Sequence, residues 1–180
     1  MQMICDPTWY IVYTKRLLEK KVMQQLTKRK IDHYCPMARM KKHENNRIIL
    51  NHKPLFPSYV FVQGNDNQIN SLSRISSILS IVHRFKEPAI ISNEEIKGIR
   101  NFVERYDNVL LEKTQLFVNH FSDTTQAGPV QQEEGNYFIN LHLPSLGYIL
   151  KANIGLESVK PADVLFLNGE YQAFTSKVAN

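Results

Sequence analysis

The sequence predicts an α+β protein with two parts: a β-α-β-β-α-β-α segment, followed by a small antiparallel β-barrel or sandwich. In the first part, strand-like runs alternate with stretches whose apolar residues recur at helical spacing. In the second part, short β-like runs are separated by Gly, Pro, Ser and Asp. The charge also changes sign. Residues 1–107 hold 18 Lys/Arg and 10 Asp/Glu, whereas residues 108–180 hold 4 and 7.

The first predicted elements are a strand and a basic helix. "TWYIVYT" (8–14) is rich in aromatic and β-branched residues, as strands are. Over residues 15–30 three apolar residues recur every four positions and mark one helical face: Leu18, Val22 and Leu26. A second extended segment is predicted over 32–42, and a loop or hairpin tip over 43–47.

The next strand is predicted from "PLFPSYVFV" (54–62). Side chains alternate between the two faces of a strand, so Tyr59 and Phe61 share one face and Val60 and Val62 share the other. Both faces are apolar. Either this strand is buried on both sides, or its aromatic face is kept for a partner.

Two more helices and one strand complete the first part. A helix is predicted over 66–79 with Asp66 as N-cap, a strand over 80–85, and a helix over 92–106 that begins with a Ser92–Glu95 capping box. The order is that of a ferredoxin-like, split βαβ fold with an added helix. Helices on one face of such an antiparallel sheet are expected to leave the other face free.

The second part is predicted to be β-structure throughout. Its β-like runs are 116–121, 135–143, 147–154 and 163–169. Pro144 and Gly147 inside the central region disfavour helices, at about 3 and 1 kcal/mol relative to alanine. The predicted organisation is a first domain over 1–107, a linker over 108–113, a barrel over 114–168 and a tail over 169–180.

The amino-acid composition limits the class of protein and its expected location. Apolar residues make up 43% and charged residues 22%, and no run is long enough to span a membrane. The N-terminus has no signal-peptide pattern, so a cytoplasmic location is expected. Cys5 and Cys35 are the only cysteines; one disulfide between them stays open.

The sequence predicts neither an enzyme nor a cofactor. It has no phosphate-binding glycine loop, no H-E-x-x-H and no G-x-S-x-G. The spacing of the following residues fits no usual zinc site: His33, Cys35, His43 and His52. His33 and Cys35 are not expected to form a catalytic pair, and a structural cysteine is the simpler interpretation.

Binding to a polyanion is the function that the charge distribution favours. Residues 15–53 hold 12 Lys/Arg and 3 Asp/Glu. Such a region suggests nucleic acid, although a solvated lysine-rich surface explains the charge equally well. Candidate DNA contacts lie along or beside the first helix: Lys15, Arg16, Gln25, Lys28 and Arg29.

Several motifs together resemble one family. "WYIVYTKR", "YCPM", "PLFPSYVFV", "VHRF", "PAIISNEEI" and "IRNFV" follow one another over about residues 8–106, as in the N-terminal domain of NusG-type transcription elongation factors. Within this family, the sequence most resembles the specialised RfaH-like antiterminators. "LPSLGYILKANI" also resembles the antiterminators of capsular-polysaccharide operons in Bacteroidetes.

The resemblance implies a fold and a set of partners. It implies an SH3-like KOW barrel in the second part, and an apolar patch that docks on the clamp helices of the largest RNA polymerase subunit: Phe56, Tyr59, Phe61, Phe85 and Ile96. It assigns the basic residues named above to the non-template DNA strand. A contact with the β subunit falls near Asn70, Ser71 and Leu72, and Ser71 is the residue that is expected to make it.

The same resemblance names partners for the barrel, ribosomal protein S10 and Rho. The expected protein is a monomer that suppresses pausing and termination, with no membrane contact and with its aromatic patch at least partly open. The alternative is a freestanding RNA- or DNA-binding module. That alternative is disfavoured because the basic residues lie outside the aromatic strand.

Overall fold

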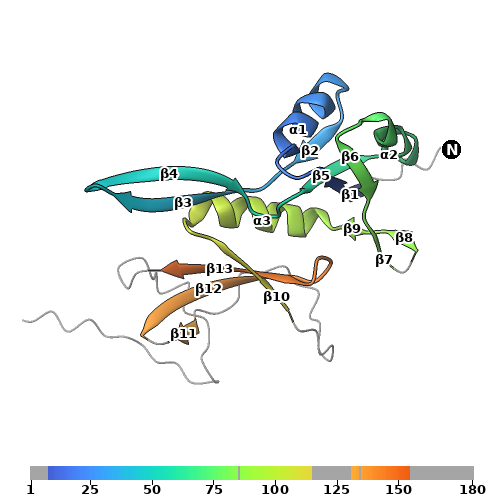
Figure 1. The fold of residues 1–180 in the computed structure, drawn as a ribbon. Helices are drawn as coiled ribbons and strands as arrows, with labels where there is room; N and C mark the ends of the chain where they lie inside the picture. The colour runs from blue at the N-terminus through green and yellow to red at the C-terminus, as the bar shows by residue number, and fades with distance from the viewer. Residues whose placement is uncertain (1–7, 85, 115–130, 134, 155–180) are drawn as a thin grey trace, which may run out of the picture.

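The computed structural model describes residues 8–84, 86–114, 131–133 and 135–154, and it contains two main antiparallel sheets with helix α3 between them (Figure 1). The first sheet has the order β2-β5-β1-β6 and consists of β1 (Thr8–Thr14), β2 (Asp32–Tyr34), β5 (Tyr59–Gly64) and β6 (Ile78–Ile81). A short strand, β9 (Ile90–Ile91), also pairs with β1. None of the helices in the described part of the chain has the length and hydropathy of a membrane-spanning segment.

Both faces of the first sheet are covered. α1 (Glu19–Lys28) and α2 (Asp66–Ser71) pack on the face that carries Val60 and Val62. α3 (Asn93–Arg105) packs on the face that carries Phe61. The expectation of a free face was therefore wrong, because the amphipathic third helix buries its own apolar stripe on it.

The first two helices are shorter than predicted. α1 begins at Glu19, since Leu17 has a positive φ of 63° and Lys15 and Arg16 lie in the turn before it. The helix predicted over 66–79 ends at Ser71, and a 3-10 turn (Leu72–Arg74) then leads into β6. Its N-cap is Asn65 instead of Asp66; the Asn65 side chain accepts from the Gln68 amide in a capping box.

A projecting hairpin was only half predicted. β3 (Met37–Glu44) and β4 (Arg47–Pro54) pair with each other alone. Asn45 and Asn46, with φ of 49° and 59°, form the tight turn, so the tip expected over 43–47 is confirmed. β4 itself was not expected. The strand predicted over 54–62 begins only at Tyr59, because residues 55–58 form a bend and a turn between β4 and β5.

The third helix begins as predicted. Ser92 accepts from the Glu95 amide at 3.1 Å, and the Glu95 carboxylate accepts from the Ser92 amide at 3.3 Å. Before it, β7 (His83–Arg84) and β8 (Glu87–Pro88) form a small two-stranded sheet.

The second sheet has the order β10-β13-β12-β11 and is antiparallel throughout. It contains β10 (Leu110–Lys113), β11 (Gln131–Glu133), β12 (Asn136–Leu143) and β13 (Tyr148–Ile154). Residues 110–113, expected as a linker, are therefore a strand of this sheet. Pro144 and Gly147 lie in the turn between β12 and β13, where Gly147 has a φ of 68°. The runs 116–121 and 163–169 lie outside the described residues.

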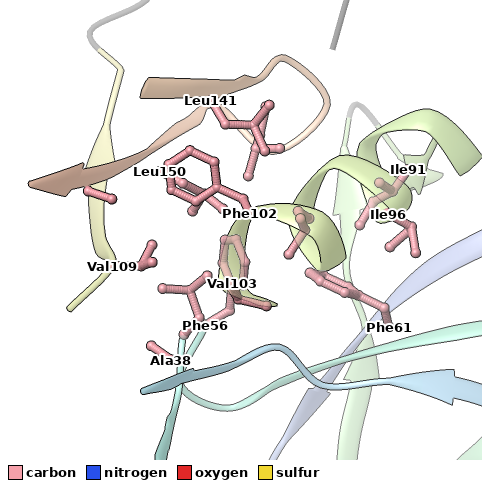
Figure 2. Close-up of a cluster of buried hydrophobic side chains, with 14 of the residues drawn as sticks. Ala38, Phe56, Phe61, Ile91, Ile96, Phe102, Val103, Val109, Leu141 and Leu150 are labelled. Atoms are coloured by element: carbon pink, nitrogen blue, oxygen red, sulfur yellow. The ribbon is translucent and has the colours of Figure 1, made fainter. Parts of the chain in front are cut away.

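One apolar cluster joins the two sheets through α3. Alternate residues of β12 and β13 give the second sheet one apolar face, which belongs to the same buried cluster as the α3 residues Ile99, Phe102 and Val103. Figure 2 shows Phe102 beside Leu150 and Leu141, with α3 between the strands of the two sheets.

Candidate functional site

The predicted polymerase patch is brought together, but most of it is buried. Phe56, Phe61 and Ile96 belong to one apolar cluster and are at most 3% exposed. Tyr59 is half-buried at the edge of that cluster. The predicted fifth member, Phe85, lies outside the described residues.

Two different contacts bury the patch. Phe61 on the first sheet and Ile96 on α3 belong to the same buried apolar cluster, so they are core residues in this arrangement. Phe56 also contacts the second sheet: its ring lies edge-on to the ring of Tyr148, with 5.9 Å between the centroids. The patch was expected to be at least partly open, and for these three residues that was wrong. Sequence reasoning considered only a helical cover, whereas an apolar β-sheet covers the face as well.

Tyr59 marks the side of the patch that stays accessible. Its ring lies edge-on to that of Tyr13 at 5.8 Å, and Tyr13 is 40% exposed. Partial burial, followed by the nearby Tyr148 and Tyr13 hydroxyls, raises the pKa of Tyr59. Three tyrosines thus meet where the two sheets approach one another. Sequence reasoning missed Tyr13 and Tyr148, although the pairing of Tyr13 with Tyr59 follows from the β1–β5 register.

A buried carboxylate joins the second sheet to α3. Glu95 Oε1 accepts from the backbone amide of Ser145 at 2.9 Å, while Glu95 Oε2 serves the helix cap at Ser92. Ser145 lies in the turn between β12 and β13. The capping residue that begins α3 therefore also holds this turn against the first part of the chain.

The candidate DNA residues form two groups at opposite ends of α1. Lys15 and Arg16 are exposed in the turn before the helix, and Lys28 and Arg29 are exposed at its C-terminal end. Gln25 lies between the two groups and is partly exposed. Ten helical residues span about 15 Å. A single strand that met all of these side chains would have to follow the length of α1.

A second buried carboxylate fixes α1 relative to the patch. Glu19, 4% exposed, lies in the first turn of α1, and its Oε1 accepts from the Ser58 amide at 2.7 Å. Ser58 has a φ of 66° and immediately precedes β5. The basic helix and the aromatic strand are thereby held in a fixed relation. The sequence gives no signal for this contact, because the two residues lie 39 positions apart.

The three residues near the predicted β-subunit contact differ in their exposure to solvent. Ser71 is partly exposed, and its hydroxyl donates to the Gln68 carbonyl at 2.6 Å. Asn70 is exposed, whereas Leu72 is fully buried and belongs to the core. Leu72 is therefore not available to a partner in this arrangement, whereas its neighbours Asn70 and Ser71 are accessible.

Among the described residues, no group of three or more His, Cys, Asp or Glu side chains is arranged to hold a metal ion. Cys35 is a free, buried thiol that donates to the Tyr59 carbonyl at 3.7 Å. Burial, and secondarily the nearby Glu19 carboxylate, raises the pKa of Cys35 to about 11.

This raised pKa predicts an unreactive thiol. Relative to an ordinary value of 9.0, a pKa of about 11 leaves roughly 100-fold less thiolate at pH 8. In a Cys5→Ser chain, Cys35 should therefore react with a chromogenic disulfide reagent at least about 100-fold faster in denaturant than in the folded protein. Equal rates in the two states would contradict the buried placement of Cys35.

Comparison of the sequence with known protein families gives one match. The family described as transcription termination factor nusG matches residues 7–100, more than half of the chain. No curated protein matches. A solved structure entitled "Domain interaction in Thermotoga maritima NusG" is 16% identical, with a TM-score of 0.43; the match covers 84% of this chain and 95% of that one.

Proposed function

The chain belongs to the NusG family of transcription factors, and from that premise we propose that it is an elongation and antitermination factor of the RfaH-like branch. The observation that carries the proposal is the family match over residues 7–100. The matching family is named for transcription termination. The opposite direction of control rests on the resemblance to RfaH-like members, and the polysaccharide operon rests on the "LPSLGYILKANI" segment.

The proposed polymerase contact is an apolar patch around the aromatic face of β5, which carries Tyr59 and Phe61. The members of the patch are Phe56, Tyr59, Phe61, Phe85 and Ile96, and the partner is the pair of clamp helices of the largest subunit. An apolar helix pair on an aromatic anchor is a common mode of recognition. The half-buried Tyr59 is the first of these side chains that a partner would meet, while Phe61 and Ile96 support the face from within.

Docking on this face requires the second sheet to move away from Phe56. The turn at Ser145 and the ring of Tyr148 lie against α3 and Phe56, respectively. Binding of polymerase would then compete with packing of the second sheet. The measured affinity for polymerase would then equal the intrinsic affinity multiplied by the fraction of molecules in which the second sheet has moved away.

The proposed nucleic-acid contact is the α1 surface. Lys15, Arg16, Lys28 and Arg29 would neutralise phosphates of the non-template strand, and Gln25 would reach a base or sugar. The Glu19–Ser58 hydrogen bond supports this assignment because it fixes α1 relative to the proposed polymerase face. Ser71 is proposed to meet the β subunit on the opposite side of the cleft.

The proposed mechanism needs no covalent chemistry. A protein that bridges both sides of the polymerase cleft would favour the closed, pause-free state, which is a shift of population. The second sheet is proposed to belong to a KOW-like barrel in a separate C-terminal domain, with ribosomal protein S10 or Rho as its partner.

An in vitro pausing assay tests this function. With purified RNA polymerase stalled at a pause site, the full chain should shorten the lifetime of the pause. Lys28→Ala with Arg29→Ala should weaken this effect, and Lys97→Ala with Lys113→Ala, which removes the same charge elsewhere, should not. A protein that binds DNA but leaves pausing unchanged would favour the freestanding nucleic-acid-binding module.

A further inference from the structure

The turn that leads into α1 carries an apolar side chain that is both exposed and strained. Leu17 is 82% exposed, more than any other large apolar residue in the described part of the chain. Its φ of 63° lies in the left-handed region, which disfavours residues with a Cβ and is usually occupied by glycine or asparagine. Leucine therefore adds strain to the free protein and gains little from packing there. Strained positions of this kind cluster where a partner binds.

Hydrogen bonds fix the backbone around Leu17. The Leu18 amide donates to the Lys15 carbonyl at 3.1 Å, which closes a turn that has Leu17 as its third residue. A positive φ at the third residue is the pattern of a type II turn. The Lys15 amide also donates to the carbonyl of Ser77 at 2.9 Å. The exposed side chain of Leu17 therefore stands on an ordered backbone, and a partner would meet a preformed contact.

The exposed residues on both sides of Leu17 are cationic. Four of them flank it in the sequence, and none forms an ion pair within the described part of the chain: Lys15, Arg16, Lys20 and Lys21. The one acidic residue among them, Glu19, is 4% exposed and accepts from the Ser58 amide. The surface around Leu17 thus combines one apolar contact with several positive charges. A nucleic-acid strand has the matching chemistry, because it joins apolar base faces through phosphates.

We propose that Leu17 packs on the face of an unstacked base of a single nucleic-acid strand, while the cations around it hold the neighbouring phosphates. This inference rests on the proposed nucleic-acid contact at α1, and it adds a residue that contacts a base instead of a phosphate. Phosphate contacts position a strand but do not depend on its bases. A side chain that packs on a base face does depend on them, and it tolerates any base because each has such a face.

Fluorescence anisotropy with the full chain tests this contact, using a labelled DNA single strand and a labelled strand of equal length in which every nucleotide lacks its base. The two probes carry the same phosphates and differ only in their bases. Leu17→Asn should weaken binding of the intact strand by about 3- to 10-fold, the gain expected from covering roughly half of a leucine side chain. Binding of the abasic strand should stay unchanged, and so should the salt dependence with either probe.

Further variants separate the base contact from charge and from folding. Leu17→Met keeps an apolar side chain and should bind both probes as wild type does, and Leu110→Thr, which removes an exposed leucine from β10, should do the same. Lys15→Ala with Arg16→Ala should weaken binding of both probes and flatten the plot of log affinity against log salt by up to about 1.4, since each single-strand phosphate contact contributes roughly 0.7. Leu17→Asn should unfold in urea at no lower a midpoint than wild type, because asparagine tolerates the left-handed region.

Two results would overturn this inference alone: Leu17→Asn binds the intact strand as tightly as wild type, or it loses the same affinity for the intact and the abasic strand. In the first case, weaker binding of the same variant to purified polymerase would assign Leu17 to a protein contact. Absence of binding to either probe at about 10⁻⁴ M protein, or unchanged binding by Lys15→Ala with Arg16→Ala, would overturn the proposed nucleic-acid contact at the start of α1 together with this inference.

Discussion

Phe61→Ala should lower the free energy of unfolding by about 3–5 kcal/mol, the usual cost of removing a fully buried phenylalanine. Phe61 is fully buried between the first sheet and α3, and its ring packs against those of Phe56 and Tyr34 at centroid distances of 5.4 and 6.3 Å. The surrounding strands and helix cannot collapse fully into the space that the ring would leave. Urea denaturation followed by circular dichroism measures the change.

Phe61→Leu is the matched control for this prediction. It keeps an apolar side chain in the cluster and should cost less than about 1.5 kcal/mol after repacking. If Phe61→Ala retained wild-type stability while polymerase binding was lost, Phe61 would be a surface contact, and its placement in the core would be wrong.

Tyr148→Asp should raise the affinity for RNA polymerase by about tenfold or more. The substitution places a carboxylate against the ring of Phe56 and removes the edge-on contact, so the second sheet should pack less well on the first part of the chain. Each 1.4 kcal/mol by which the closed arrangement is weakened gives a tenfold gain, as long as most molecules are closed. Equilibrium binding to purified polymerase measures the gain.

Tyr148→Phe keeps the ring and should bind polymerase as wild type does. This pair of variants separates loss of the aromatic contact from loss of the hydroxyl group. If the Asp variant is folded and binds no more tightly than wild type, the contact between Tyr148 and Phe56 does not limit access to the polymerase face.

In the first part of the chain, most secondary-structure elements could be predicted from local sequence patterns. The strand at 8–14 and the Ser92–Glu95 cap depend on side-chain alternation and on a short-range hydrogen bond, and both were predicted. The helix expected over 66–79 failed because Leu79 sits at helical spacing from Ile75 yet lies on strand β6. Here strand pairing with β1 overrides a local apolar spacing.

Long-range contacts explain what the sequence could not show at the candidate site. Glu19 with Ser58, and Glu95 with Ser145, join residues 39 and 50 positions apart. The periodic spacing of apolar residues along the sequence does not indicate which distant residues form such hydrogen bonds. The burial of Phe61 has the same origin, since period two places it on a face but does not say what covers that face. The prediction that this face was free depended on the position of α3, which the sequence pattern left open.

Polymerase is proposed to bind the sheet face at Tyr59, and one affinity measurement distinguishes this face from any other. In the Tyr148→Asp background, Tyr59→Ala should weaken binding to purified RNA polymerase by about 30-fold, because an interface anchor contributes about 2 kcal/mol. Tyr59→Phe should retain the affinity of the parent. If the folded Tyr59→Ala protein binds polymerase as tightly as its parent, the polymerase face lies elsewhere on the molecule.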